Sequence, residues 1–474
     1  MSTHPSSIPS PPAEFPTPPA KVAKPIRRRK HAHSSSGLTA AEPQVSAAVH
    51  DKLKTLLASL DAIPEPRMAG RVVHRLGELL FCALCTLLCG GECYTDMEDF
   101  TQAKLSWLRG YIKLTNGVPS HDVFRNVFAA IKPDALHRAL SSAWPSSASN
   151  IEGQVVSFDG KTLCGSALPS AGLPPLHILR AFVKSSGLTI AYQACGDKGG
   201  EAAALDELLE NTDVAGSIVT VDAGMGTIEA AKKIQAKGAD FLFTIKGNSG
   251  GDYKSLEQHS NRLRDALWVI NPNANRAPAE RIKEVIESIG RSLPPTPLSA
   301  QQLESETSAA QAFLKTFKSS HHTKLSHGRY QDQYVYVTTD LSWWPKSWKW
   351  EQAGAKTLMI VVRSNHRGGS KDGGPGFEVV HCLTSREGSA EELAKILTDH
   401  WGIENSCHYV LDVTFGEDRS QVRDHQAAQN LTQMRDLARF MLKRFSKATV
   451  RSKRMRCMWS DIVLADILAY NFNT

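Results

Sequence analysis

The chain has 474 residues, of which 41% are hydrophobic and 22% charged, and its formal net charge is +7. This composition is typical of a globular protein, and the length allows two or three domains with a sizeable core. The longest largely apolar run, Leu79 to Cys89, is shorter than the roughly 20 residues that a membrane-spanning helix needs, so we expect no membrane segment. The nine cysteines have no framework spacing and no signal peptide precedes them, so we expect reduced thiols in a cytoplasmic protein.

The first half of the chain divides into a tail and a helical region. Residues 1–50 contain nine of the 24 prolines, and we predict a disordered tail there. From 51 to 147 apolar residues recur at helical spacing, which predicts an all-helical domain. Pro119–Asp122 is typical of a turn and an N-cap before a helix at Val123.

Four cysteines of the helical region fall on one helical stripe, which raises a metal-site hypothesis. They are Cys82, Cys85, Cys89 and Cys93. A continuous helix would spread them over roughly 16 Å, which is too far for one tetrahedral zinc site. The pattern therefore favours small buried residues of the core.

From 151 to 252 the hydrophobic period changes to that of an α/β domain. The predicted order is three strands, a helix, a strand, a helix and a strand. The segments are Val155–Phe158, Leu176–Val183, Leu188–Ala194, Ala202–Leu209, Ser217–Val221, Thr227–Lys237 and Asp240–Ile245. Two of these strands end in an aspartate, Asp159 and Asp222, at the edge where open α/β sheets bind ligands. The alternative for Asp159-Gly160 is a tight hairpin turn.

The last two regions are a β-rich insertion, 253–387, and a helical end, 388–474. In the insertion, strands are predicted at Tyr330–Val337 and Lys356–Val362, Pro294–Thr307 is a loop or weak helix, and Arg367–Gly376 is a Gly-rich loop. A cluster of four tryptophans either fills a small core or stacks on bases, and the core is favoured: Trp343, Trp344, Trp348 and Trp350.

The helical end contains one acidic residue among bulky apolar ones and one basic segment. We expect Glu404 to be buried, so that it needs a metal or a basic partner. Residues 435–456 contain nine Lys or Arg against one acid, which indicates either phosphate contacts or a solvated helix face.

Asp159, Asp222 and Glu404 together suggest a metal-ion site. Clustered carboxylates repel one another unless cations lie between them. Two ions, each held by one or two carboxylates and by substrate phosphate, are the usual arrangement for phosphodiester cleavage, and Mg²⁺ (or Mn²⁺) suits it. Lys161 and Lys246 flank the predicted site.

Several separated motifs resemble the DDE transposases of bacterial insertion sequences, in the subgroup that includes the H-repeat-associated proteins. They are Asp159-Gly160-Lys161-Thr162-Leu163, Val219–Ala223, Lys246-Gly247-Asn248, His327-Gly328-Arg329 and His400–Asn405, continued to Arg423. The helical region resembles the associated N-terminal domain of that subgroup. The resemblance runs from about residue 52 to about residue 470.

The resemblance implies an RNase H-like catalytic domain interrupted by a β-rich insertion and preceded by an all-helical domain. It implies that Asp159, Asp222 and Glu404 are catalytic metal ligands, that double-stranded DNA (element ends and target) is the partner, and that a homodimer assembles on it. In a bacterial host the protein would be nucleoid-associated. The DNA-binding residues that we predict are Lys161, Lys246, Asn248, His327, Arg329, Asn405, Arg419, Arg423, Lys443, Arg444, Arg451 and Lys453.

Three readings of the function follow. The first is a transposase that cleaves DNA at element ends and transfers the strand to a target. The second is an inactive or domesticated DNA-binding descendant, which Gly224, an extra residue beside Asp222, favours. The third is a general endonuclease, which does not explain the helical N-terminal region. Leu397, His400 and Leu411 stand where the wider family often has Tyr, Arg and Lys around the glutamate.

Overall fold

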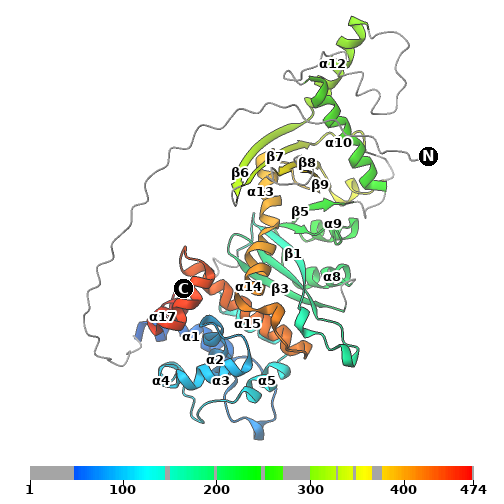
Figure 1. The fold of residues 1–474 in the computed structure, drawn as a ribbon. Helices are drawn as coiled ribbons and strands as arrows, with labels where there is room; N and C mark the ends of the chain where they lie inside the picture. The colour runs from blue at the N-terminus through cyan, green and yellow to red at the C-terminus, as the bar shows by residue number, and fades with distance from the viewer. Residues whose placement is uncertain are drawn as a thin grey trace, which may run out of the picture. The chain divides into compact units, whose positions relative to one another are not determined.

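The computed structural model describes residues 47–144, 150–196, 200–246, 251–270, 299–326, 329–344, 348–365 and 376–471 (Figure 1). The predicted tail, 1–50, lies outside the described residues except for its last four, which already belong to helix α1, and so does nearly all of the predicted Gly-rich loop. None of the described helices combines the length and the apolar content that crossing a bilayer requires.

The N-terminal region is helical, as predicted. Its helices are α1 (Ala47–Asp61), α2 (Leu76–Leu88), α3 (Tyr94–Ala103), α4 (Leu105–Leu108), α5 (His121–Ala130) and α6 (Pro133–Ser142). Every residue of α2 is buried, because this helix is apolar on all sides and the others pack around it. Helix α5 begins two residues earlier than predicted, at His121.

The cysteine stripe belongs to the core rather than to a metal site. Cys82, Cys85 and Cys89 are buried, and burial raises the pKa of the Cys82 thiol to about 12. Cys93 is exposed at the start of α3, beyond the glycines that end α2, so it is the one member that leaves the stripe. All nine cysteines are free thiols.

The N-terminal helices share one hydrophobic core with the end of the chain. The C-terminal helices are α15 (His425–Phe445), α16 (Val450–Trp459) and α17 (Asp461–Asn471). Leu84 of α2, Phe128 of α5, Leu437 of α15 and Leu468 of α17 belong to the same buried cluster, and Figure 1 shows α15 and α17 beside α1 and α2. Neither group of helices therefore has a complete core without the other.

The described residues form a mixed sheet of nine strands. The strands are β1 (Val155–Thr162), β2 (His177–Val183), β3 (Leu188–Cys195), β4 (Ile218–Val221), β5 (Asp240–Ile245), β6 (Lys318–Ser326), β7 (Arg329–Thr338), β8 (Thr357–Asn365) and β9 (Gly376–Thr384), in the order β3-β2-β1-β4-β5-β9-β8-β7-β6. Strands β1, β4 and β5 are parallel, and α8 (Glu201–Asn211) and α9 (Ile228–Ala236) connect β3, β4 and β5. The predicted order of elements from 155 to 245 is confirmed.

The β-rich part of the predicted insertion extends this sheet instead of forming another one. Strand β9 pairs antiparallel with β5, with Leu242 opposite Thr384, and β8, β7 and β6 follow in antiparallel order. Trp344 and Trp350 are buried, and the ring of Trp350 lies 6.4 Å from that of Phe241. For these two tryptophans the core interpretation is confirmed.

Residues 257–317 belong to a second compact unit. The described part of that unit contains most of α10 (Gly251–Ile270) and all of α12 (Ala300–Leu314). Ser299 and Gln302 form a capping box at the start of α12, which explains why a helix forms where a loop or weak helix was expected. Phe313 packs against His259 and Phe317.

Helix α13 (Ala390–His400) covers one face of the sheet and leads into the predicted glutamate. Leu393 and Leu397 of α13 pack on Val155, Ile218 and Leu242, one from each parallel strand. A π-helical turn, Glu404–His408, and α14 (Tyr409–Phe415) follow. Alternate residues of a strand face the same side, so Ser157 and Asp159 lie on the face that α13 covers.

Candidate active site

Two of the predicted acidic residues lie side by side at one edge of the sheet. In the parallel pair β1–β4, Phe158 is opposite Val221, and Asp159 and Asp222 are the next residues. The Asp159 side chain is 21% exposed and that of Asp222 55%, so both carboxylates reach solvent. The carboxyl ends of parallel strands meet at this edge, which is where open α/β sheets bind ligands.

The residue after Asp222-Ala223 does not disturb this placement. The amide of Met225 donates to the carbonyl of Asp222 at 2.9 Å, which closes a short turn. A Cβ atom built on Gly224 would meet nothing within 4 Å, so the additional residue lies in open space.

Glu404 begins the π-helical turn, a conformation that is rare and often found at functional sites. Ile403, Cys407 and Leu411 anchor this segment in the core, while Glu404 itself is exposed. The prediction that Glu404 is buried is therefore wrong. The protein around its carboxylate still removes part of the water, and this desolvation raises the pKa of Glu404, as do the negative charges of Asp159 and Asp222. The three carboxylates thus act on one another.

Two buried histidines lie beside the strands that carry these aspartates. His408 is buried and its Nδ1 lies 3.3 Å from Oδ2 of Asp159. His400 is also buried, and its Nδ1 lies 2.9 Å from the hydroxyl of Thr220, which in turn donates to Ser157 at 3.1 Å. Burial lowers the pKa of His400, which keeps the imidazole neutral. Neither histidine was among the predicted site residues, although both are four residues from Glu404, the spacing that places helical side chains on one face.

The donor set fits Mg²⁺ shared between carboxylates better than a single closed metal cage. Within the described residues, no three His, Cys, Asp or Glu side chains lie close enough to hold one ion. Two-ion sites do not need such a cage, because each ion takes one or two carboxylates and completes its shell with water and phosphate. Besides desolvation, repulsion from Asp159 and Asp222 raises the pKa of Glu404. Bound cations would relieve this repulsion.

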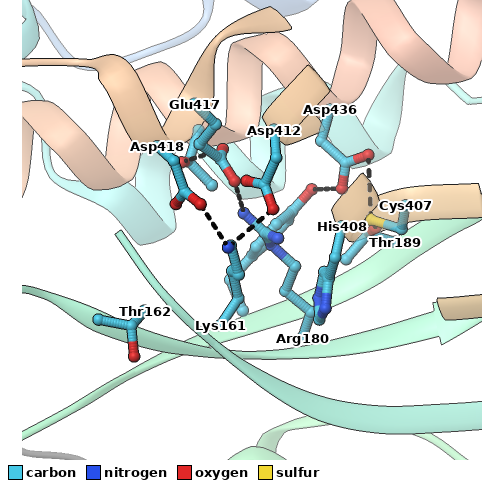
Figure 2. A network of polar contacts seen from close by, with 12 residues as sticks. Lys161, Thr162, Arg180, Thr189, Cys407, His408, Asp412, Glu417, Asp418 and Asp436 are labelled. Carbon is cyan, nitrogen blue, oxygen red and sulfur yellow. Dashed lines mark hydrogen bonds and ion pairs between the residues drawn. The ribbon is translucent and has the colours of Figure 1, made fainter. Parts of the chain in front are cut away.

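The two lysines beside the carboxylates differ in the number of ion pairs that they form. Nζ of Lys246 lies 3.3 Å from Oδ1 of Asp222 in an exposed ion pair. Nζ of Lys161 lies 2.8 Å from Asp412 and 3.1 Å from Asp418, as Figure 2 shows. A phosphate would have to compete with two carboxylates for Lys161 but with only one for Lys246.

A buried polar network connects the sheet to α15 and to Glu417, which follows the Glu404 turn and α14 in the chain. Arg180 of β2 is fully buried and pairs with Glu417 at 2.8 Å, and Glu417 accepts from Thr432 of α15 at 2.6 Å (Figure 2). Asp436 of α15 accepts from Tyr192 of β3 at 2.7 Å. The network was missed from the sequence, although an arginine inside the apolar strand His177–Val183 is a visible signal for a buried ion pair.

The other predicted DNA-binding residues are scattered over the described surface or lie outside it. Asn405, Arg419, Arg423 and Arg451 are exposed, and Lys443 and Arg444 are half-buried. The Asn405 side chain donates to the carbonyl of Trp401 at 3.0 Å. Asn248 and His327 lie outside the described residues, and Arg329 is the first residue of β7.

The basic segment 435–456 is largely internal. Four of its nine cationic residues are buried: Arg435, Arg439, Lys453 and Arg454. Lys453 donates to the carbonyls of Lys443 and Ser446 at 3.4 and 2.8 Å, so it caps the end of α15. The prediction that Lys453 contacts DNA is therefore wrong, because the Lys453 ammonium is buried and hydrogen-bonded within the protein.

A parallel sheet core with acids at adjacent strand ends, opposite a helical glutamate, defines the RNase H-like class of α/β folds. Comparison with known families gives the particular family. Residues 171–441 match the model described as "Transposase DDE domain", and residues 57–144 match the one described as "DDE_Tnp_1-associated". The chain belongs to the DDE transposase family. The matched span includes Asp222 and Glu404 and begins after Asp159.

One relative matches most of the chain and two others match parts of it. "H repeat-associated putative transposase YhhI" of Escherichia coli (strain K12) is 27% identical over 420 residues, which is 88% of this chain and 98% of that protein. "H repeat-associated putative transposase YbfD" of the same strain is 32% identical over 207 residues, 44% of this chain and 82% of that protein. "Inactive transposase YbfQ", also from that strain, is 36% identical over 76 residues, 16% of this chain and 90% of that protein.

Proposed function

We propose that the protein is a DNA transposase that binds the ends of its element, hydrolyses a DNA strand to release a 3′-hydroxyl, and joins that hydroxyl to target DNA. One observation carries the proposal. Asp159 and Asp222 follow a register pair of adjacent parallel strands, and desolvation together with their charges raises the pKa of Glu404 on the facing segment.

Asp159, Asp222 and Glu404 would hold the divalent ions, Mg²⁺ or Mn²⁺. When bound, such ions activate the attacking hydroxyl and stabilise the leaving oxygen of the phosphodiester. The chain itself supplies rigidity. The hydrogen bonds from His400 through Thr220 to Ser157 tie α13 to β4 and β1, and His408 orients the Asp159 carboxylate.

The basic residues around the site would bind the DNA backbone. Lys246 flanks Asp222, and Arg419 and Arg423 follow the glutamate segment. In the basic segment, Arg451 is exposed and Lys443 and Arg444 are half-buried, so these three predicted contacts remain accessible. We propose that two copies assemble on DNA, because one active site would serve each element end.

A cleavage assay tests this proposal. Labelled DNA carrying the inverted repeats that flank the gene would be incubated with the full chain and Mg²⁺. Wild type is expected to cut at the repeat ends, and Asp159→Asn to lose at least about a hundredfold in rate while still binding the DNA. Asp206→Asn, on α8, is the matched control and keeps wild-type cleavage, because Asp206 pairs with Lys233 at the surface and with no other cation in the described part of the chain.

The second candidate is a DNA-binding descendant without cleavage, which the similarity to "Inactive transposase YbfQ" supports. The same assay separates the two functions. If wild type and Asp159→Asn both bind the repeats and neither cuts them with Mg²⁺ or Mn²⁺, the binding protein is the better description. Cleavage of the repeats by wild type alone rejects it.

A further inference from the structure

A cavity of about 540 Å³ lies away from the carboxylates, between the N-terminal helices and the chain after α14. One wall is the start of α3 and of α5, and the other is Gly416–Ala427 together with Arg435 of α15. This volume is within the range of small-molecule sites and is large enough for a nucleotide. None of the three carboxylates lines this cavity, although Arg419 and Arg423 in its wall are among the proposed DNA contacts.

Arg435 places a buried positive charge in the wall that makes no direct ion pair within the described residues. The residue is 2% exposed, and its one hydrogen bond runs from Nη2 to the carbonyl of Glu92 at 2.9 Å. Its Nε is buried and has no hydrogen-bond partner among the residues that the structure describes. Glu417, the nearby acid, is already paired with Arg180 and Thr432. A buried guanidinium without an ion pair is costly, so an anion from outside the chain would stabilise it.

The acids in the same wall cannot supply that anion, because each is already used. Asp96 accepts from the amides of Glu92 and Cys93, and Asp424 accepts from the amide of Ala427. Glu92 pairs with Arg419 at 3.3 Å. The hydroxyl of Tyr94 is a further buried group without a partner in the described part of the chain.

Three helices begin at this cavity. The first turns of α3, α5 and α15 all contribute lining residues, so the positive ends of three helix dipoles favour negative charge there. Arg423 adds an exposed guanidinium whose contact is a 3.5 Å hydrogen bond to Gln421. Buried charge, unpaired hydroxyl and helix ends point to the same kind of ligand.

We propose that this cavity binds a phosphate group of nucleotide size, with Arg435, Tyr94 and Arg423 as its donors. The phosphate comes either from a DNA strand or from a free phosphate or nucleotide. Residues of the N-terminal helices and of α15 both line the site. A bound phosphate would therefore stabilise the packing of these helices on each other. The inference does not depend on cleavage by the three carboxylates.

Thermal melting of the full chain with inorganic phosphate, at constant ionic strength set with chloride, tests the site. Phosphate is expected to raise the melting temperature of wild type. Tyr94→Phe removes only an unpaired hydroxyl, so it does not lower the melting temperature of the free protein, yet it weakens phosphate binding about tenfold or more. Arg423→Gln weakens it in the same way without touching the core.

Tyr111→Phe is the matched control, because the Tyr111 hydroxyl is also buried without a partner but does not line the cavity. It keeps the wild-type response to phosphate. No phosphate response in wild type, or an equal response in wild type, Tyr94→Phe and Arg423→Gln, overturns the inference. Asp159→Asn keeps the response, so failure of the cleavage proposal is recognised separately.

Competition identifies the source of the phosphate. If inorganic phosphate displaces a single-stranded oligonucleotide, and Tyr94→Phe weakens both ligands, the cavity holds a phosphate of a DNA strand. If Tyr94→Phe weakens inorganic phosphate and a mononucleotide but leaves oligonucleotide binding unchanged, the ligand is a free phosphate compound. Either result supports the site.

Discussion

At the residue scale, the chain keeps part of its charge inside the protein by pairing it. Arg180 and Glu417 are both fully buried, and their 2.8 Å contact is what makes the burial possible. Mutual attraction holds the pKa of Glu417 below its usual range despite desolvation, so the carboxylate stays ionised. The pair connects the sheet to the segment that follows α14, which is why its loss would affect the placement of Glu404.

The first prediction concerns this pair. Arg180→Met leaves the Glu417 carboxylate buried and unpaired, so unfolding free energy is expected to fall by about 3–5 kcal/mol. Adding Glu417→Leu to Arg180→Met recovers part of the loss. Urea denaturation measures both variants. Lys233→Met breaks the exposed pair with Asp206 and should cost less than about 1 kcal/mol. A similar small cost for Arg180→Met would contradict the argument.

The second prediction follows from the raised pKa of Glu404. Partial burial and the charges of Asp159 and Asp222 make the folded protein hold this proton more tightly than the unfolded chain does. Stability therefore falls as pH rises from the ordinary glutamate pKa, about 4.3, through the folded value, and the penalty persists at neutral pH. Glu404→Gln removes the charge, so without metal it should melt higher than wild type at pH near 7 but not at pH near 4.

Under the proposed function Mg²⁺ should reverse this order, because it would bind the folded wild-type site. An ion at a hundred times its dissociation constant stabilises by about 2.7 kcal/mol, and Glu404→Gln should show a smaller gain. Melting curves with and without Mg²⁺ across this pH range measure both effects. Equal responses of wild type and Glu404→Gln to the ion would exclude Glu404 as a ligand.

At the element scale, α15 shows how the two ends of the chain are joined. Residues on all of its sides are buried, including polar ones, because each polar side chain bonds to a neighbouring element. Nδ2 of Asn430 donates to the carbonyls of Phe128 and Ile131 at 2.8 and 2.7 Å, at the end of α5. Nε of Arg454, on α16, donates to the carbonyl of Leu87 at the end of α2. Side chains of the C-terminal helices thus cap the N-terminal ones.

The third prediction tests this joint. Asn430→Ala leaves two buried carbonyls without donors, so unfolding free energy should fall by about 2–3 kcal/mol. Chemical denaturation should show a lower midpoint with an unchanged slope. Asn405→Ala removes an exposed amide that also bonds to a carbonyl, that of Trp401, and should change stability little. If both variants lose the same small amount, Asn430 does not join the two helical groups.

The elements differ in how much the sequence alone revealed. Period-two runs predicted β1 to β5 because these strands are local patterns, and the Asp-Gly turn alternative is wrong because β1 continues through both residues to Thr162. The sequence could not show that β9 would pair with β5, since residues more than 130 positions apart meet there. It also misplaced Glu404 and Lys453, because burial is set by long-range packing that no local period reports.

At the scale of the whole molecule, the surface available to DNA is smaller than the basic composition implies. The net charge of +7 includes guanidinium groups that are fully enclosed, such as Arg180 and Arg439. Enclosed charges contribute little to counterion release, which depends on cations placed against phosphates. The accessible cations should therefore dominate binding to double-stranded DNA.

The fourth prediction separates these two kinds of cation by the salt dependence of binding. Plotted as log affinity against log salt concentration, the slope for double-stranded element-end DNA should become about 0.9 less steep for each phosphate contact removed. Arg451→Gln, at an exposed position in the basic segment, is expected to produce such a change with little loss of stability. Lys453→Met, only two residues away, should leave the slope unchanged but lower the melting temperature, because its ammonium binds the carbonyls that end α15. Fluorescence anisotropy at several salt concentrations measures the slopes. Equal slopes for wild type and Arg451→Gln would remove Arg451 from the interface, whereas a shallower slope for Lys453→Met at full stability would show that the basic segment binds DNA as its sequence first indicated.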